Sequence, residues 1–379
     1  TDSKGSNNGV NVGATTTTSV YGGNAPILPR AIDVAKEGQA DAIGGGSALF
    51  NGNSDFVQVN NITLPNLEPY TITAWINSSD VDQPQAIALW GDQALNERRA
   101  MIIFNGGNGN DWTLVASTNG QNPQGATNVT EGEWIHASIT VNPSTKAYKI
   151  YMNGILDGSG TYSSDLVAFS NSTLFIGKSY FGEFFEGNIS QVGIWYGELT
   201  QAQIQSVMES TSYQNIPADV KSTLGSELIT NGTFDSNITG WGKSNISNTP
   251  TLSYSNGKAR IAYSSSGNNI NIGINTTNNP FNGISGTVKV TGNIQIISGS
   301  ISSGSFFQVY ETNTANNVSV IPDSNGDFTA YIIVGSNQQL GIYASAEVCT
   351  FEVDNISAKL VTNDIVAYYS LDGDSSANG

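Results

Sequence analysis

The chain has 379 residues, of which 38% are hydrophobic and 12% are charged, and its formal net charge is −17. Charged residues make up about a quarter of an ordinary globular protein, so much of this surface must consist of uncharged polar residues and glycine. An acidic chain of this kind is repelled by phosphate groups, which argues against nucleic acid and anionic membrane surfaces as partners.

Cysteine content and hydropathy exclude intrachain disulfides and argue against membrane spans. Cys349 is the only cysteine, so no intrachain disulfide can form. The first residues hold no apolar leader core, and no stretch approaches the ~18 apolar residues of a membrane span. We therefore expect no membrane insertion and no export through an N-terminal signal.

Residues 1–45 hold no strand pattern of domain quality. They begin with a polar stretch, continue through a run of threonines at 15–18, and then contain Gly and Pro residues that keep a chain extended or turned. We predict an extended N-terminal arm that docks onto its own domain, a sister chain or a larger assembly.

Residues 46–210 change to short runs in which apolar and polar residues alternate. Turn residues separate the runs, and Asn51-Gly52 and Asn153-Gly154 are typical tight-hairpin dipeptides. Short strands at this spacing, without helical intervals, predict an antiparallel sandwich. Thr200 ends the alternation and can cap a short helix, whose Ile204, Val207 and Met208 face one side.

A linker at 211–225, which can form a helical turn after Pro217, leads to a second β pattern at 226–361, whose loops are richer in Ser, Asn and Gly. Residues 362–379 hold one lone strand, which cannot bury itself. That strand either pairs back onto a module or opens a further domain. The sequence therefore predicts an all-β chain of tandem antiparallel β-sandwich (jelly-roll) domains with an extended N-terminal arm.

Several segments of the first module follow one another in a familiar order. They are Gly45-Gly-Ser-Ala-Leu-Phe-Asn-Gly, Tyr70-Thr-Ile-Thr-Ala-Trp, Glu133-Trp-Ile-His-Ala, Tyr151-Met-Asn-Gly and Gly187-Asn-Ile-Ser-Gln-Val. In this order they resemble the laminin-G-like, concanavalin A-like jelly-roll family. Each segment is weak alone, but the ordered set is specific.

The first module departs from that family at two points. The family often closes with Ile-Asp-Glu-Val, whereas this chain has Ile189-Ser-Gln-Val, so a metal-ligand position is missing. The family's opening strand is not evident before Ser47, but a similar strand appears at Ile365-Val-Ala-Tyr-Tyr-Ser-Leu-Asp. This suggests that the tail begins a second laminin-G-like module.

The second module contains Glu227-Leu-Ile-Thr-Asn-Gly-Thr-Phe-Asp near its start and Phe351-Glu-Val-Asp-Asn-Ile near its end. These segments resemble the first and last strands of a carbohydrate-binding-module jelly roll. The resemblance implies a structural Ca²⁺ held by Thr233, Asp235 and Asp354. Calcium takes about six to eight oxygen ligands, so these three side chains supply part of its shell.

Candidate catalytic groups are few. A catalytic His136 would need a nucleophile and an orienting partner, and we predict a structural role for it. Glu183 and Glu186 flank two phenylalanines but do not match the Glu-x-Asp-x-x-Glu arrangement of concanavalin-type glycosidases, so we predict that they are solvated loop acids. The sequence therefore predicts a protein without enzymatic activity.

Aromatic faces bind sugars together with hydrogen bonds from amides and carboxylates. We predict carbohydrate binding by the residues of this kind that stand close to loops, which are Trp90, Asp92, Asp111, Trp112, Tyr180 and Phe181. The alternative for each tryptophan is packing in the core or in a hairpin. Trp75, Trp134 and Trp195 stand inside strands and are predicted core residues.

The arm, the order of the modules and the surface rich in Asn, Ser and Thr resemble long virion proteins of marine tailed phages. The resemblance implies a tail-fibre or head-fibre (decoration) protein that is made in the host cytoplasm and carried on the virion. Its arm would bind other virion proteins, its sandwiches would bind host-surface glycans, and it would form a homo-oligomer such as a trimer. The alternative is a bacterial surface or secreted glycan-binding protein, located outside the cell.

Overall fold

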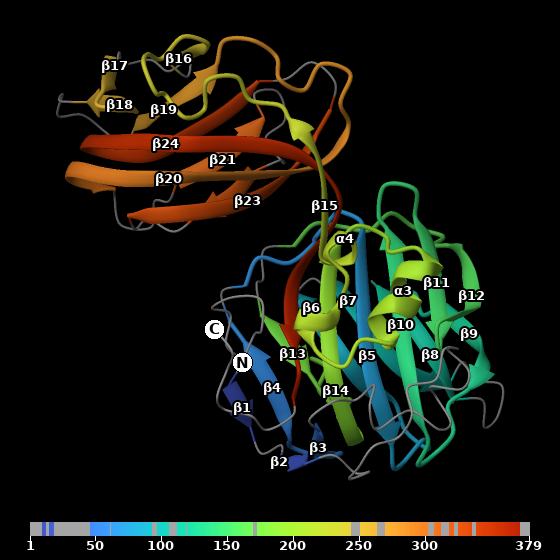
Figure 1. The fold of residues 1–379 in the computed structure, drawn as a ribbon. Coiled ribbons are helices and arrows are strands. Elements are labelled where there is room, and N and C mark those ends of the chain that lie inside the picture. Colours follow the sequence, from blue (N-terminus) through green and yellow to red (C-terminus); the bar gives the residue numbers. More distant parts are fainter. Residues whose placement is uncertain are drawn as a thin grey trace. The chain divides into compact units, whose positions relative to one another are not determined.

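A computed structural model divides the chain into two compact units (Figure 1). Unit 1 consists of Thr1–Thr223 and Thr362–Gly379, and unit 2 consists of Leu224–Val361. The structure describes residues 10–12, 15–18, 46–60, 62–92, 97–105, 112–118, 120–169, 173–243, 251–263, 270–301, 307–311, 318–321, 325–335 and 339–371. Strands account for 60% of it and helices for 6%, so the predicted all-β class is confirmed.

Unit 1 is a sandwich of two antiparallel sheets. Sheet I has the strand order β2 (Thr15–Thr18), β3 (Gly46–Asn51), β14 (Glu186–Tyr196), β5 (Tyr70–Ser78), β10 (Trp134–Asn142), β11 (Ala147–Met152), β12 (Ile155–Thr161). Sheet II is seven-stranded, in the order β1 (Val10–Val12), β4 (Phe56–Val59), β13 (Leu174–Ile176), β6 (Gln85–Asp92), β7 (Glu97–Asn105), β8 (Trp112–Thr118), β9 (Gln124–Asn128).

The core of unit 1 lies between the two sheets, because alternate residues of each strand point toward the opposite sheet. Tyr70 of β5 meets Trp90 of β6 with ring centroids 5.2 Å apart, and both residues are fully buried. Trp75, Trp134 and Trp195 alternate with the inward-facing residues and lie on the other face of sheet I, where Trp75 and Trp195 are fully buried and Trp134 is 2% exposed. The prediction that Trp75, Trp134 and Trp195 are core residues is confirmed.

Two pieces of the predicted N-terminal arm are strands of unit 1. β1 pairs with β4 in sheet II, and β2 pairs with β3 in sheet I. Strand pairing uses main-chain groups, and threonine favours extended backbone, so these strands need no apolar alternation that the sequence could reveal. The other residues before Gly46 lie outside the described part of the chain.

A capped helix follows β14, as the sequence predicts. α3 (Gln201–Met208) begins after Thr200, whose hydroxyl oxygen accepts the N–H of Gln203 at 3.3 Å. The predicted inward-facing residues Ile204, Val207 and Met208 are buried. This helix is therefore confirmed in both position and orientation.

The stretch that the sequence predicts as a linker, 211–225, is largely structured. It contains η1 (Tyr213–Asn215) and α4 (Ala218–Lys221), and its Ile216 and Val220 join a core cluster with Trp195. The indole N–H of Trp195 donates to the Val220 carbonyl at 3.0 Å. These contacts place residues 211–223 in unit 1, because their apolar side chains are anchored in its core.

The tail strand pairs back onto unit 1. β24 (Leu340–Tyr369) runs through unit 2, and its last residues align antiparallel with β14, from Val192 opposite Tyr369 to Tyr196 opposite Asp364. The sequence left two alternatives for the tail, pairing back onto a module or opening a further domain. In this structure the tail pairs back onto a module. Unit 1 is thus built from two stretches of chain that are separated by the whole of unit 2.

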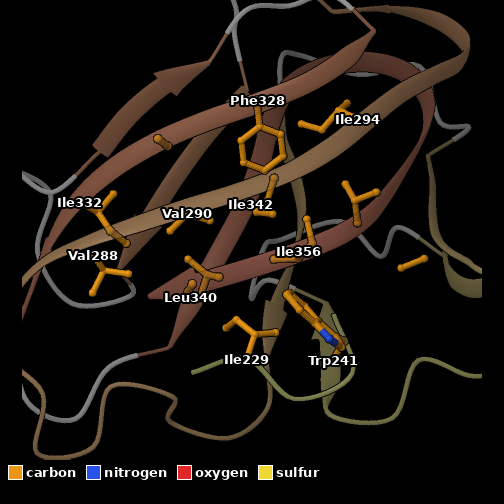
Figure 2. Packing of buried hydrophobic residues seen from close by; sticks show 14 of the residues in the cluster. Ile229, Trp241, Val288, Val290, Ile294, Phe328, Ile332, Leu340, Ile342 and Ile356 are labelled. Carbon is orange, nitrogen blue, oxygen red and sulfur yellow. The ribbon is translucent and has the colours of Figure 1, made fainter. Parts of the chain in front are cut away.

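Unit 2 is a second antiparallel sandwich. One run of strands is β17 (Thr251–Ser255), β18 (Lys258–Tyr263), β24, β20 (Gly286–Ile301), β23 (Gly326–Val334). The other is β16 (Trp241–Lys243), β19 (Ile270–Thr276), β24, β21 (Phe307–Glu311), β22 (Val318–Ile321). β15 (Ser222–Glu227) leads into this unit. Its core gathers Trp241, Val290, Phe328, Ile342 and Ile356 among others (Figure 2).

Candidate functional site

The face of sheet II that points away from the core carries an apolar cluster. The register places its members side by side on neighbouring strands, and three partly buried aromatic residues pack against them. The cluster consists of Ala86, Leu89, Ala100, Ile102, Val115 and Phe175, with Phe56, Phe104 and Tyr180 against it. These six residues are buried, so the cluster is a second apolar layer that supports the side chains lying over it.

The turn at 177–185 brings further side chains to this face. Its shape is fixed locally, because the Ser179 hydroxyl oxygen accepts the N–H groups of Phe181 at 3.0 Å and Glu183 at 3.3 Å. Gly177 has a φ of 81°, and a Cβ there would lie 2.5 Å from the Phe50 ring. Only glycine fits this position, so the direction of the turn is set where it leaves β13.

The turn joins three of the predicted sugar-binding residues. The Tyr180 hydroxyl donates to the Gly91 carbonyl at 2.6 Å, next to Asp92 at the end of β6. Burial raises the pKa of Tyr180 to about 12, and the charge of Asp92 acts in the same direction. Phe181, the next residue, is 48% exposed. The turn therefore brings together Asp92, Tyr180 and Phe181. The sequence alone could not establish this proximity.

Arg98 of β7 contacts this neighbourhood from an adjacent strand of sheet II. Its Nε donates to Ser117 Oγ at 2.6 Å, its Nη2 donates to Asn122 Oδ1 at 3.2 Å, and its Nη1 lies 3.4 Å from Glu183 Oε2. The Cζ atom of Arg98 is 5.1 Å from the ring centroid of Phe181. Burial lowers the pKa of Arg98, and the charge of Glu183 opposes that shift.

Glu183 departs from its prediction. Its side chain is 15% exposed and paired with Arg98, so it is not a solvated loop acid. The sequence could not show this, because Arg98 stands far away along the chain and only the strand register brings it to the turn.

Lys178 adds a cation to the same face. Its Nζ lies 4.2 Å from the ring centroid of Phe56, 5.4 Å from that of Phe175 and 5.6 Å from that of Phe184. The ion pairs of the described residues do not include Lys178, so ring faces hold its charge. We define the aromatic patch as Phe56, Asp92, Arg98, Asn122, Lys178, Tyr180, Phe181, Glu183 and Phe184.

Two predicted sugar-binding tryptophans lie elsewhere. Trp90 is fully buried, and its indole N–H donates to the Pro65 carbonyl at 2.6 Å. Its ring has no face open to a ligand, so the prediction for Trp90 is wrong. Trp112 is half-buried and pairs with Asn105, at the end of β7 opposite to Arg98. Asp111 lies outside the described residues.

The predicted calcium ligands form an incomplete set. The Thr233 hydroxyl donates to Asp235 Oδ2 at 3.0 Å, and Asp354 Oδ1 accepts the Asn355 N–H at 2.7 Å. Among the described residues, no group of three or more acidic, histidine or cysteine side chains could hold a metal ion. Two carboxylates and one hydroxyl fall short of the about six to eight oxygens that Ca²⁺ takes. These side chains do not by themselves fit the ion.

His136 is fixed in the core of unit 1. It is 1% exposed, its ring lies 5.3 Å from that of Trp75, and its Nδ1 is 3.4 Å from Ser138 Oγ. Burial lowers the pKa of His136 to about 3, so the imidazole is neutral at physiological pH. These contacts agree with the predicted structural role.

Within the described ranges, none of the helices has the length and apolar character needed to cross a bilayer.

Comparisons with known proteins identify a related family and a related curated protein. Residues 51–205 match the family described as "Concanavalin A-like lectin/glucanases superfamily" (Laminin_G_3). A curated relative, the sushi, von Willebrand factor type A, EGF and pentraxin domain-containing protein 1 of Rattus norvegicus, is 29% identical over 160 residues. That match covers 39% of this chain and 4% of the relative, so the chain spans only a small part of the relative's length.

Two solved structures are among those similar to this chain. Domain 4 of AbnA, a GH43 extracellular arabinanase from Geobacillus stearothermophilus, is 20% identical with a TM-score of 0.37, over 52% of this chain and 87% of that one. The tailspike protein 2 of Escherichia coli O157:H7 bacteriophage CAB120 is 13% identical with a TM-score of 0.35, over 52% of this chain and 26% of that one.

From the family match and the two-sheet sandwich together, unit 1 contains a laminin-G-like domain of the concanavalin A-like jelly-roll type.

Proposed function

We propose that the chain binds glycans through the aromatic patch of unit 1. The observation that carries this proposal is the stacking of the exposed Phe181 ring on Arg98, beside Asn122 and Glu183. A sugar ring presents C–H groups to an aromatic face and hydroxyl groups to polar neighbours, and the patch supplies both within one small area. Sites for small ligands usually combine apolar rings with a few fixed polar groups in this way.

Binding in this proposal occurs without catalysis. Glycoside hydrolysis uses two carboxyl groups about 5–10 Å apart on either side of the bond that breaks. In the patch, Glu183 is engaged by Arg98, and the buried, neutral His136 is remote from solvent. The family that unit 1 matches includes both lectins and glucanases, and the arrangement of these residues favours the lectin role.

We further propose that the chain is displayed on a phage particle as a tail-fibre or head-fibre protein. Support comes from the presence of two antiparallel sandwiches in one chain and from a composition with few charged residues. Residues 1–45 would bind other virion proteins, and the chain would form a symmetric oligomer such as a trimer. Mass spectrometry of purified particles tests this role, because a virion part is present in stoichiometric copies. The alternative, a bacterial surface or secreted glycan-binding protein, predicts its absence from particles.

The binding proposal is tested with the full chain and a panel of bacterial-surface polysaccharides. We expect Phe181→Ala to weaken binding about tenfold or more, since an exposed anchor ring is lost. Tyr254→Ala is the matched control, because Tyr254 is 44% exposed and lies in unit 2. Equal affinity of Phe181→Ala and the wild-type chain would refute the patch, and release of reducing sugar from any polysaccharide would refute the non-catalytic role.

A further inference from the structure

Strand β14 has two different neighbours along one edge. Residues Glu186 to Ile189 pair with β3, whereas residues Val192 to Tyr196 pair with the tail, residues 364–369. The change occurs at Gln191, whose φ of 50° lies in the left-handed region. One half of this edge is therefore covered by the sequence just before the sandwich, and the other half by sequence that follows unit 2.

Hydrogen bonds mark the junction between these two neighbours. The Ser190 hydroxyl reaches the Gly46 carbonyl at 2.8 Å and the Ser370 carbonyl at 3.1 Å. The Gln191 N–H donates to the same Ser370 carbonyl at 3.1 Å. A single residue of β14 thus touches the start of β3 and the end of the tail strand, which fixes the register of the tail.

The tail strand is also part of the core of unit 1. Ile365 and Tyr368 belong to the cluster that contains Trp195 and Leu199. The Tyr368 hydroxyl donates to Gln191 Oε1 at 2.9 Å. Side chains of this strand therefore fill apolar positions, while its main chain completes the hydrogen bonds of β14.

The strand can be separated from the unit that precedes it in the chain. The core cluster of unit 2, as far as the described residues define it, lies between Ile229 and Leu360 and takes no member from the tail. Unit 2 thus does not need residues 362–371 for its own packing. Unit 1 needs them, and its acceptor edge lies more than one hundred residues earlier in the chain.

We propose that the Val192–Tyr196 edge of β14 is a strand acceptor that also takes residues 364–369 of a second copy of this chain. Addition of a strand to an open edge obtains affinity from main-chain hydrogen bonds and register from alternate side chains. Each copy carries both the acceptor edge and the donor strand, so a reciprocal exchange closes a two-fold dimer and a non-reciprocal exchange builds an open row of copies. This inference is independent of glycan binding.

The chain's own tail competes with that of a second copy. A tethered strand acts at an effective concentration on the order of millimolar, so the internal pairing prevails in dilute solution. Exchange requires that the tail be free when the acceptor edge forms, which occurs during refolding. Crowding of copies in an assembly favours the intermolecular pairing for the same reason.

Cysteine trapping in the full chain tests the proposal. All variants carry Cys349→Ala, which removes the native thiol. Ile194 and Ala367 lie directly opposite each other and are fully buried, so Ile194→Cys and Ala367→Cys in one chain report internal pairing. The same two substitutions on separate chains, unfolded and refolded together, report exchange. Ile194→Cys mixed with Asp327→Cys is the control, because Asp327 is an exposed residue of unit 2.

We expect an interchain disulfide between the two single variants, above the Asp327→Cys control, that rises about tenfold for a tenfold increase in chain concentration until it saturates. An excess of a synthetic peptide of residues 362–371 should suppress it. If the double variant closes its internal disulfide while the mixed single variants stay at the control level at every concentration, exchange does not occur. If the double variant fails to close, the pairing of the tail with β14 is itself wrong.

Discussion

The Cζ atom of Arg98 lies 5.1 Å from the centroid of the Phe181 ring, and the same guanidinium binds Ser117, Asn122 and Glu183. One cation thus fixes an exposed ring from a strand that is remote from it in sequence. A ring held in this way loses little freedom when a ligand packs on it, which lowers the cost of binding.

Removal of Arg98 should destabilise unit 1 as well as weaken binding. Arg98→Ala leaves the partly buried Glu183 carboxylate without its partner, and we expect a loss of about 2–4 kcal/mol in the free energy of unfolding. Lys146→Ala breaks a pair with Asp165 whose side chains are 36% and 90% exposed, and it should cost less than about 1 kcal/mol. Chemical denaturation of both variants makes the comparison, and equal losses would contradict the role of Arg98.

Two glycine substitutions test how the backbone shape of the turn at 177–185 contributes to stability and to glycan binding. Gly177→Ala should lower stability by about 1–3 kcal/mol and weaken glycan binding, because its Cβ would meet the Phe50 ring and its φ is 81°. Gly182→Ala has a nearly identical φ of 82° but open space around the Cβ, so only the backbone strain remains. Thermal unfolding and ligand titration of the two variants should rank Gly177→Ala as the worse, and the reverse order would contradict this account.

His136 should make the fold sensitive to mild acid. Its folded pKa of about 3 lies below the ordinary value of 6.5, so the unfolded chain binds the proton more readily. The contribution of His136 is complete above about pH 6.5 and is lost as the pH falls toward 3, by up to about 1.4 kcal/mol per pH unit. Between pH 7 and 5 the wild-type chain should lose about 2 kcal/mol more than His136→Gln. Parallel pH profiles of the two proteins would show that His136 is not buried.

The tail strand should contribute to the stability of unit 1. Ile365 is 1% exposed in the cluster with Trp195, so Ile365→Ala should cost about 2–4 kcal/mol. Ile297 of unit 2 is 43% exposed, and Ile297→Ala is the matched control, with a change within about 0.5 kcal/mol. Denaturant unfolding monitored by tryptophan fluorescence measures both changes. A negligible loss for Ile365→Ala would mean that the tail does not belong to unit 1.

Local patterns made much of the fold predictable. Alternation of apolar and polar residues indicates strands whatever they pair with, and the capping residue Thr200 marks the start of α3 because its partner Gln203 is three residues away. A lone histidine inside a strand motif likewise points to a buried residue. Each of these features depends on neighbours in sequence, so the sequence alone was sufficient.

The aromatic patch depends instead on the register between remote strands. Arg98 of β7 and Lys178 after β13 reach the same face only because both strands flank β6. Trp90 stands close to a loop in the sequence, but that position does not tell which face of β6 carries its side chain. A β-bulge between Ala86 and Ala88 shifts the alternation of β6, so Leu89 faces the patch and Trp90 faces the core. A bulge of this kind leaves no clear mark in the sequence.

The most direct test of glycan binding at the patch is a crystal structure of the full chain with a bound saccharide from the polysaccharide panel. We predict that the sugar ring packs on Phe181, within hydrogen-bonding distance of Asn122 or Arg98. A sugar bound instead at Trp112, or on unit 2 beside Tyr254, with the Phe181 ring free, would contradict the central claim.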